Sequence, residues 1–361
     1  MQEVCMIGEK KGCFSSLFLM GMAISLIGYS LFMPEKAMET ARNALSVFAV
    51  SVLPSLALFS VCAKILMKSG FTEKLYRLKP VALRLGMSAG GFSAFVIGAF
   101  AGFPMGAAVL AELCERGSMD KKEAASLLPF CNQAGAAFVV GTVGTSLFGN
   151  KDIGCLLFMA QTAAAFFGIC ITAGKRRANI DVSDAPKTKP QPFFSVITAS
   201  IRESAFAMLS VCAFIVFFSL ATAAFFDLFA IGLPSVIRIL TGGFLEISTG
   251  FVSLAKAELS WESTLLFSGI FLGTGGISVF FQALDRTEHL FYAPKQYCFG
   301  KILSAVLCPV MALLLFECYQ WKNSLFLCFA VFFSIVFLTF CMVAFPKKPF
   351  LKKLCALRNK N

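Results

Sequence analysis

The sequence predicts an all-α integral membrane protein. Its 361 residues are 58% hydrophobic and only 14% charged, and their mean hydropathy is +0.79. A soluble domain with this composition would have to expose too much apolar surface to water. The apolar residues also fall in blocks of about 20, the length that a helix needs to cross a hydrocarbon core. We therefore expect lipid to be the main solvent of this chain.

Eight apolar blocks predict full transmembrane helices. The first block follows Lys10 and Lys11, but it is long for a signal peptide and lacks a clear small-residue cleavage site, so we expect it to be retained. The predicted spans are residues 14–33, 44–67, 124–148, 153–173, 203–226, 264–284, 300–317 and 324–345.

Two other blocks predict re-entrant hairpins. Residues 87–113 are broken by Gly-Phe-Pro at 102–104, and residues 234–257 are broken by Gly242-Gly243 and carry Glu246 near the middle. Each arm has about ten residues, too few to cross the membrane. If both blocks return to the side they entered, 26 of the 32 Lys and Arg residues are cytoplasmic; if both cross, 19 are. The positive-inside rule favours hairpins and places both termini in the cytoplasm of a bacterial inner membrane protein.

The two halves of the chain repeat each other with opposite orientation. The run SAFVIGAFAGFPMGAAVLAEL parallels RILTGGFLEISTGFVSLAKAE, and the spans that follow place Gly135 opposite Gly276. The predicted organisation is an N-terminal cytoplasmic segment with the first span (1–38), a first repeat (39–174), a basic cytoplasmic linker (175–199), an inverted second repeat (200–320), and a last span with a basic cytoplasmic tail (321–361).

Helix breaks and buried polar residues predict a binding site near the bilayer midplane. A broken helix exposes backbone groups that lipid cannot satisfy, and transporters use such groups to hold ions and solutes. A carboxylate at this depth is costly unless it is paired or hydrated. Packed kinks, a protonated structural Glu and helix–helix hydrogen bonds are the alternatives. The candidate residues are Gly102, Pro104, Gly106, Asn132, Gln133, Glu246, Thr274, Ser278 and Gln282.

Other kinds of chemistry have no sequence support. The chain has no GxxxxGK[ST], HExxH or GxSxG motif, its single histidine lies in a charged DRTEH loop, and its cysteines lack metal-ligand spacing. We therefore expect no enzyme, no disulfides and no metal site. The net charge of +12 fits basic cytoplasmic loops, so no nucleic acid is expected as a partner. The expected partners are the lipid bilayer and a small polar solute, with Na+ or H+ as a coupling ion and no other cofactor. A homo-oligomer is left open.

Four ordered motifs resemble a known family. The runs GAFAGFPMGAAVLAEL, PFCNQAGAAFVVGTVG, FLEISTG and GTGGISVFFQAL are similar to those of YlbJ-type sporulation integral membrane proteins, within the nucleoside-recognition (Gate) superfamily. The layout is more distantly similar to concentrative nucleoside transporters. That resemblance implies two hairpins and two partly unwound spans around a solute. The transporters carry polar and acidic side chains at the first hairpin tip, whereas this chain reads AGFPMG there.

Two functional hypotheses follow. The first is a secondary transporter of a small polar, nucleoside-like solute that is linked to sporulation. The second is a non-transporting membrane scaffold, or partner-recruiting component, of spore cortex assembly. The buried Glu246 favours transport, because a carboxylate in the membrane is costly to keep without a use.

Overall fold

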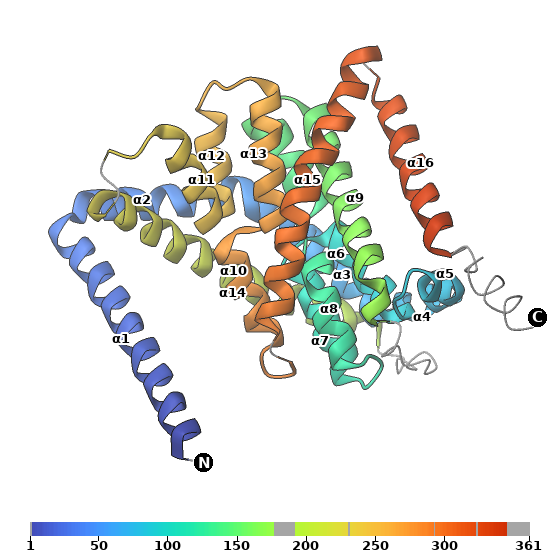
Figure 1. Cartoon of the computed structure of the whole chain (residues 1–361), viewed down its shortest axis with the longest axis horizontal. Helices are drawn as coiled ribbons and strands as arrows, with labels where there is room; N and C mark the ends of the chain where they lie inside the picture. The colour runs from blue at the N-terminus through green and yellow to red at the C-terminus, as the bar shows by residue number, and fades with distance from the viewer. Residues whose placement is uncertain (1, 177–191, 230–231, 292, 323, 345–361) are drawn as a thin grey trace, which may run out of the picture.

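The computed structural model describes residues 2–176, 192–229, 232–291, 293–322 and 324–344, and these are helical with short connections (Figure 1). No strand occurs among them. The helices are α1 (Gln2–Phe32), α2 (Pro34–Val47), α3 (Leu53–Lys68), α4 (Phe71–Leu75), α5 (Lys79–Arg84), α6 (Ala89–Ala101), α7 (Met105–Glu115), α8 (Lys121–Cys131), α9 (Lys151–Arg176), α10 (Phe193–Leu228), α11 (Ser235–Leu245), α12 (Ile247–Ala255), α13 (Trp261–Thr274), α14 (Gly276–Thr287), α15 (Pro294–Lys322) and α16 (Leu325–Ala344). Two π-helices, η1 (Phe48–Val52) and η3 (Ala137–Leu147), and a short 3₁₀ turn, η2 (Tyr76–Leu78), complete the set.

Fewer helices meet the length requirement for a membrane span than the eight that the sequence predicts. In the described residues, five helical stretches are long and apolar enough. A sixth is counted if the segment Phe71–Arg84, which meets α6 at 103°, forms one bent span with it. The five stretches are Pro34–Lys68, Lys151–Ala173, Phe193–Leu228, Trp261–Thr287 and Pro294–Trp321. The chain is thus an all-helical membrane protein with about five or six spanning helices.

Both predicted hairpin blocks form pairs of short helices that pack against each other. The first pair is α6 and α7, separated by residues 102–104, and the second is α11 and α12, separated by Glu246. Pro104 precedes the first turn of α7, where its missing N–H costs nothing. With 9 to 13 residues each, none of the four arms can cross a bilayer alone.

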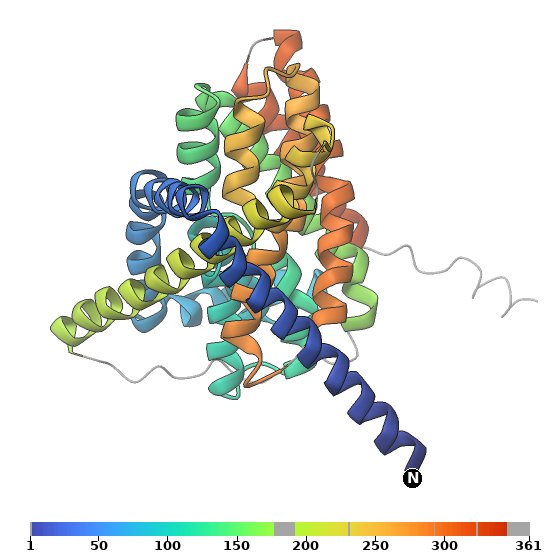
Figure 2. The same ribbon diagram turned by 90° about the vertical axis from the view of Figure 1, so that its left-hand side faces the viewer.

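The two hairpins open toward opposite ends of the molecule. In Figure 1 the α7–α8 connection lies at the lower end, whereas the α12–α13 connection lies at the upper end. The end of α14 and the start of α15 also lie at the lower end, and the end of α15 and the start of α16 lie at the upper end. Figure 2 shows α10 (yellow-green) running obliquely across one side of the bundle, where it packs against α1 and α2 (blue). The connections named here therefore alternate between the two ends of the molecule.

Several boundaries differ from those predicted. The predicted span 44–67 belongs to a helix that begins at Pro34, and the span 203–226 to a helix that begins at Phe193. The predicted span 124–148 is broken between α8 and η3. Of the predicted linker, residues 177–191 lie outside the described part of the chain, and residues 193–199 already belong to α10.

The break in the second hairpin is also displaced from the predicted one. Gly242 and Gly243 continue α11, which ends at Leu245. Glu246 has extended backbone angles and caps the N-terminus of α12, because its carboxylate accepts the N–H of Thr249 at 2.7 Å. The prediction that the glycines break this block is wrong: a helix tolerates glycine, and here the glycines permit close packing instead.

Candidate functional site

Each hairpin is held together by glycines at the contact of its arms. A Cβ added to Gly98 of α6 would lie 3.2 Å from the Cα of Gly106 in α7. In the second hairpin, a Cβ added to Gly250 of α12 would collide with the backbone of Gly243 in α11. In both hairpins the backbones therefore approach to a distance that a side chain would prevent.

A broken span packs against each hairpin tip. The first tip contains Gly102 with φ +78°, a conformation that favours glycine, and its Cβ position is filled by the backbone of Gly135 in the α8–η3 break. The second tip meets Gly276 at the α13–α14 break, where an added Cβ would lie 3.2 Å from the carbonyl oxygen of Gly243. Gly135 and Gly276 are the two positions that the sequence repeat aligns.

A buried lysine lies between the two breaks. The ammonium of Lys301, in α15, donates a hydrogen bond of 2.7 Å to the carbonyl oxygen of Asn132, the residue that ends α8. The same nitrogen is 3.7 Å from the Cβ position of Gly275, the left-handed residue between α13 and α14. Lys301 is only 6% exposed. The predicted span 300–317 places Lys301 at its start, whereas α15 begins earlier, at Pro294, so Lys301 lies within the helix on a buried face.

The α8–η3 break is surrounded by uncharged polar groups. Asn132 donates to the hydroxyl of Tyr297 at 3.4 Å, and the side-chain amide of Gln133 donates to the carbonyl of Phe130 at 2.6 Å. Gln161 of α9 pairs with both backbone groups of Ala134, accepting its N–H at 3.2 Å and donating to its C=O at 2.8 Å. This amide thus replaces the helical hydrogen bonds that the break removes.

Two oxygen atoms of this network have no partner. Asn132 and Gln133 are 0% and 3% exposed, and neither side-chain carbonyl oxygen has a hydrogen-bond partner among the described residues. Gln133 and Lys301 also line a small cavity of ≈ 10 Å³ between α8, α9, α13 and α15. A volume of about 10–15 Å³ is the least that holds one water molecule. Gln133, with its free acceptor oxygen, and the ammonium of Lys301 therefore line a space with the volume of about one water molecule.

The other predicted site residues have different environments. Glu246, 1% exposed, serves as the cap of α12, so part of its cost is offset by a helix N-terminus. The hydroxyl of Thr274 bonds back to the carbonyl of Ile270 within α13. Gln282 donates to Ser278 one turn earlier at 3.3 Å, and both are buried on α14. Within the described residues, no hydrogen bond joins these groups to Asn132.

Sequence reasoning missed three members of the site: Lys301, Tyr297 and Gln161. Each lies in a segment whose sequence looks like a simple apolar span or like the end of such a span. Gln161 is an isolated amide inside the apolar block 153–173, and Lys301 stands next to Gly300 at the predicted start of a span. A polar residue inside an apolar block was the available signal for Gln161.

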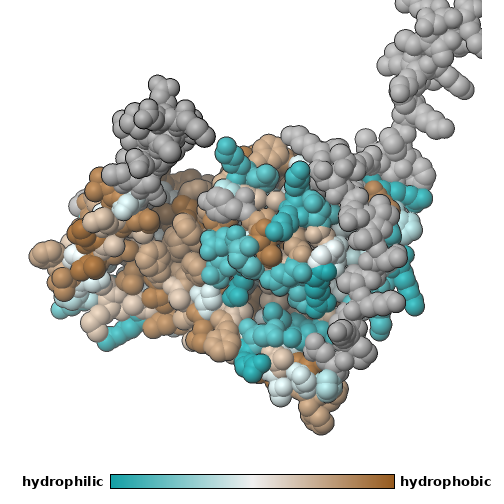
Figure 3. Space-filling model, turned by 90° about the horizontal axis from the view of Figure 1, so that it is seen from below, coloured by the Kyte–Doolittle hydropathy of each residue, from teal (hydrophilic) through white to brown (hydrophobic). Residues whose placement is uncertain are grey.

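A charged cavity of about 460 Å³, which we call the vestibule, opens between α3, α7, α10 and α14. Figure 3 shows hydrophilic side chains gathered on one part of the lower face of the molecule, beside apolar surface. The charged lining residues are four basic and four acidic: Lys64, Lys68, Arg116 and Arg286, with Glu112, Glu115, Glu203 and Asp285.

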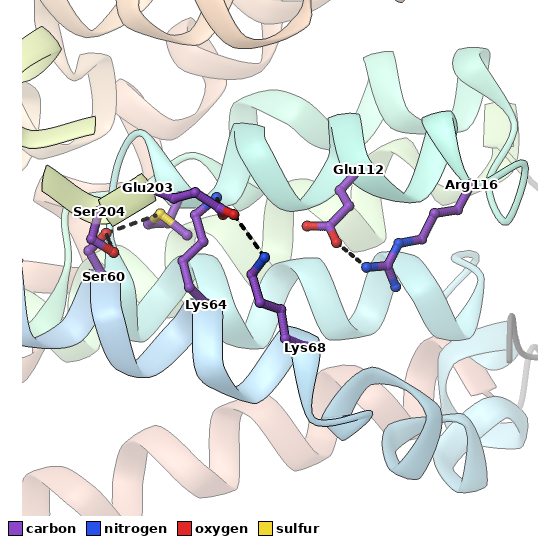
Figure 4. Close-up of polar contacts among 8 residues, drawn as sticks. Ser60, Lys64, Lys68, Glu112, Arg116, Glu203 and Ser204 are labelled. Atoms are coloured by element: carbon purple, nitrogen blue, oxygen red, sulfur yellow. Dashed lines mark hydrogen bonds and ion pairs between the residues drawn. The ribbon is translucent and has the colours of Figure 1, made fainter. Parts of the chain in front are cut away.

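Ion pairs organise this vestibule. The Glu203 carboxylate of α10 joins two lysines of α3, at 3.2 Å from Lys64 and 2.8 Å from Lys68 (Figure 4). Arg116 pairs with Glu112 one turn earlier on α7. Deeper in, the buried hydroxyl of Ser60 bonds that of Ser204 at 3.1 Å. Polar groups thus continue from the charged opening toward the interior between α3 and α10.

Comparison with known proteins agrees with the membrane architecture. The sporulation integral membrane protein YlbJ of Bacillus subtilis (strain 168) is 24% identical over 323 residues, which cover 79% of this chain and 78% of YlbJ. The chain is therefore similar to a YlbJ-type integral membrane protein over most of its length. No family model matches it, and no solved structure matches it.

The similarity to YlbJ confirms the resemblance to YlbJ-type proteins that the four motifs predict. YlbJ is a sporulation protein, which is consistent with the predicted link to sporulation. Membership of the nucleoside-recognition superfamily and likeness to nucleoside transporters stay predictions.

Proposed function

We propose that this YlbJ-like protein is a secondary transporter of a small polar solute, acts in sporulation and catalyses no chemical reaction. The observation that carries the proposal is the convergence of two broken spans and two hairpin tips on Lys301 and the unpartnered oxygens of Asn132 and Gln133. Backbone breaks inside a membrane persist where protein or a polar cavity surrounds them, and transporters place their sites at such breaks.

The proposed architecture is an inverted repeat of residues 39–174 and 200–320, with eight spans, two re-entrant hairpins and both termini in the cytoplasm. It is supported by the matched roles of Gly135 and Gly276, each of which packs on the tip of its own hairpin. It is also supported by the opposite ends at which the two hairpins open in Figure 1. Alternating access would then move the hairpins against the spans around a fixed centre.

The vestibule favours a neutral or zwitterionic solute. Its lining carries four basic and four acidic side chains, so it has no large net charge to attract ions of one sign. Its volume of about 460 Å³ is within the range of small-molecule pockets. We propose that it is the cytoplasmic opening of the transport path.

Uptake into proteoliposomes tests the proposal. The full-length protein is reconstituted with an inward Na+ or H+ gradient, and uptake of radiolabelled uridine and alanine is measured as probes of the nucleoside and amino-acid classes. We expect gradient-dependent uptake of a probe, reduced about 10-fold or more in Glu246→Gln and in Asn132→Ala. The matched control is Glu262→Gln, which alters an exposed carboxylate on α13.

The same variants distinguish the second candidate function. A scaffold of spore assembly predicts that Glu246→Gln, expressed in a spore-forming host, still supports spore formation. A transporter predicts a sporulation defect equal to that of a deletion. Wild-type uptake that persists unchanged in both site variants would exclude this site.

A further inference from the structure

Lys301 is a cation held inside the protein without a carboxylate partner. Its ammonium has three donors, and the hydrogen bond to the Asn132 carbonyl is the one that the structure shows. The ring of Tyr297 lies 5.6 Å from the same nitrogen. In the described part of the chain, no Asp or Glu carboxylate forms an ion pair with it.

The groups that face Lys301 from the surrounding helices are uncharged. From α8 and α9 they are the Asn132 carbonyl, Gln133 and Gln161. From α13 they are backbone at Leu272 and Gly273, and α15 itself adds Ser304 and the titratable side chains Tyr297 and Cys308. The acceptor that the ammonium reaches is therefore a main-chain carbonyl oxygen, and the polar side chains that share its cavity are amides and a hydroxyl.

This environment is that of a monovalent cation. The C-terminal carbonyls of a helix carry partial negative charge, and unwound backbone carbonyls in transporters coordinate Na+. Here the end of α8 supplies such a carbonyl, and the Asn132 and Gln133 side chains supply free oxygens beside it. The lysine stem delivers a cation to this position, and while the amine is protonated its charge repels a second cation.

The space beside the ammonium is too small for a solute. The cavity of ≈ 10 Å³ that Lys301 lines has room for about one water molecule, which can exchange a proton with the side chain. An anionic solute as counter-ion does not fit in this conformation. The size of the cavity therefore favours Lys301 as a cation that the protein itself supplies, and not as a charge that binds an anionic solute.

We infer that the Lys301 ammonium occupies the cation position where the two broken spans meet, in place of an alkali ion. Given the proposed function as a transporter, we further infer that transport is coupled to protons through this lysine. In the coupling step one N–H bond of the ammonium breaks, the electron pair stays on nitrogen, and the proton passes to the cavity water.

Thermal stability in different salts tests the cation position without any transport assay. The purified full-length protein is melted in NaCl, LiCl and choline chloride at equal ionic strength. We expect the wild type to melt at the same temperature in all three. In Lys301→Ala, the vacated carbonyl oxygen of Asn132, with the free side-chain oxygens of Asn132 and Gln133, should bind Na+ and raise the melting temperature by about 2 °C or more relative to choline.

Two further variants control for packing and charge. Lys301→Met fills the space without a charge and should gain no Na+ response. Lys295→Ala removes an exposed lysine from the same helix and should behave as the wild type. A Na+-specific rise in the wild type would overturn the inference, and so would a Lys301→Ala protein that ignores Na+. If Lys301→Ala does not fold, Lys301→Ser takes its place in the salt series, and the same two outcomes apply to it.

Uptake measurements test the coupling separately. A pH gradient without Na+ should drive probe uptake in the wild type and in Lys295→Ala, but not in Lys301→Met. Uptake that requires Na+ would overturn proton coupling. If no probe is taken up at all, the proposed function fails, whereas the salt series still tests the built-in cation.

Discussion

Substituting Gly98 by alanine tests the close contact on which the first hairpin depends. The new Cβ would meet the carbonyl oxygen of Cys131, and it would lie 3.0 Å from the Cys131 carbonyl carbon and 3.2 Å from the Cα of Gly106. These are backbone atoms of α8 and α7, so no side chain can rotate away. Overpacking of this kind costs about 1–3 kcal/mol, while alanine in a helix regains up to about 1 kcal/mol.

We therefore expect Gly98→Ala to lose about 1–2 kcal/mol of stability. The corresponding fall in melting temperature is about 2–4 °C, measured by thermal unfolding in detergent. The matched control is Gly141→Ala in η3, where an added Cβ has nothing within 4 Å. The control should melt at or slightly above the wild-type temperature. If Gly98→Ala is as stable as Gly141→Ala, α6, α7 and the end of α8 do not meet as described.

Two other predictions follow from the same elements. Gln161→Leu removes both hydrogen bonds to the Ala134 backbone and should cost about 2 kcal/mol or more, because each buried unpaired group costs about 1–3 kcal/mol. Thermal unfolding measures this loss against Gln282→Leu, which removes a single bond to Ser278; equal losses would contradict the argument. Reporter fusions after Lys121 and Lys256 should be active in the cytoplasm and outside the membrane, respectively. Both reporters on one side would refute the inverted hairpins.

The sequence alone predicts the membrane class and the positions of several backbone breaks. Blocks of apolar residues reflect the thickness of the bilayer, and the Gly-Phe-Pro break ends α6 because residues 102–104 cannot continue a helix. Asn132 and Gln133 could also be identified, because polar amides inside an apolar block are costly unless they have a role. These properties depend on local composition and on the lipid solvent.

Only the tertiary structure decided which polar residues meet and which face of each helix is buried. From the sequence, Lys301 is expected at the membrane interface. In the structure it is buried, because α15 packs against the end of α8. Glu246 reads as a residue beside a glycine break, yet it forms the break itself by capping α12. Apolar periodicity carries little information in a helix that is hydrophobic on every side, so the neighbours of each residue follow from packing between helices far apart in the chain.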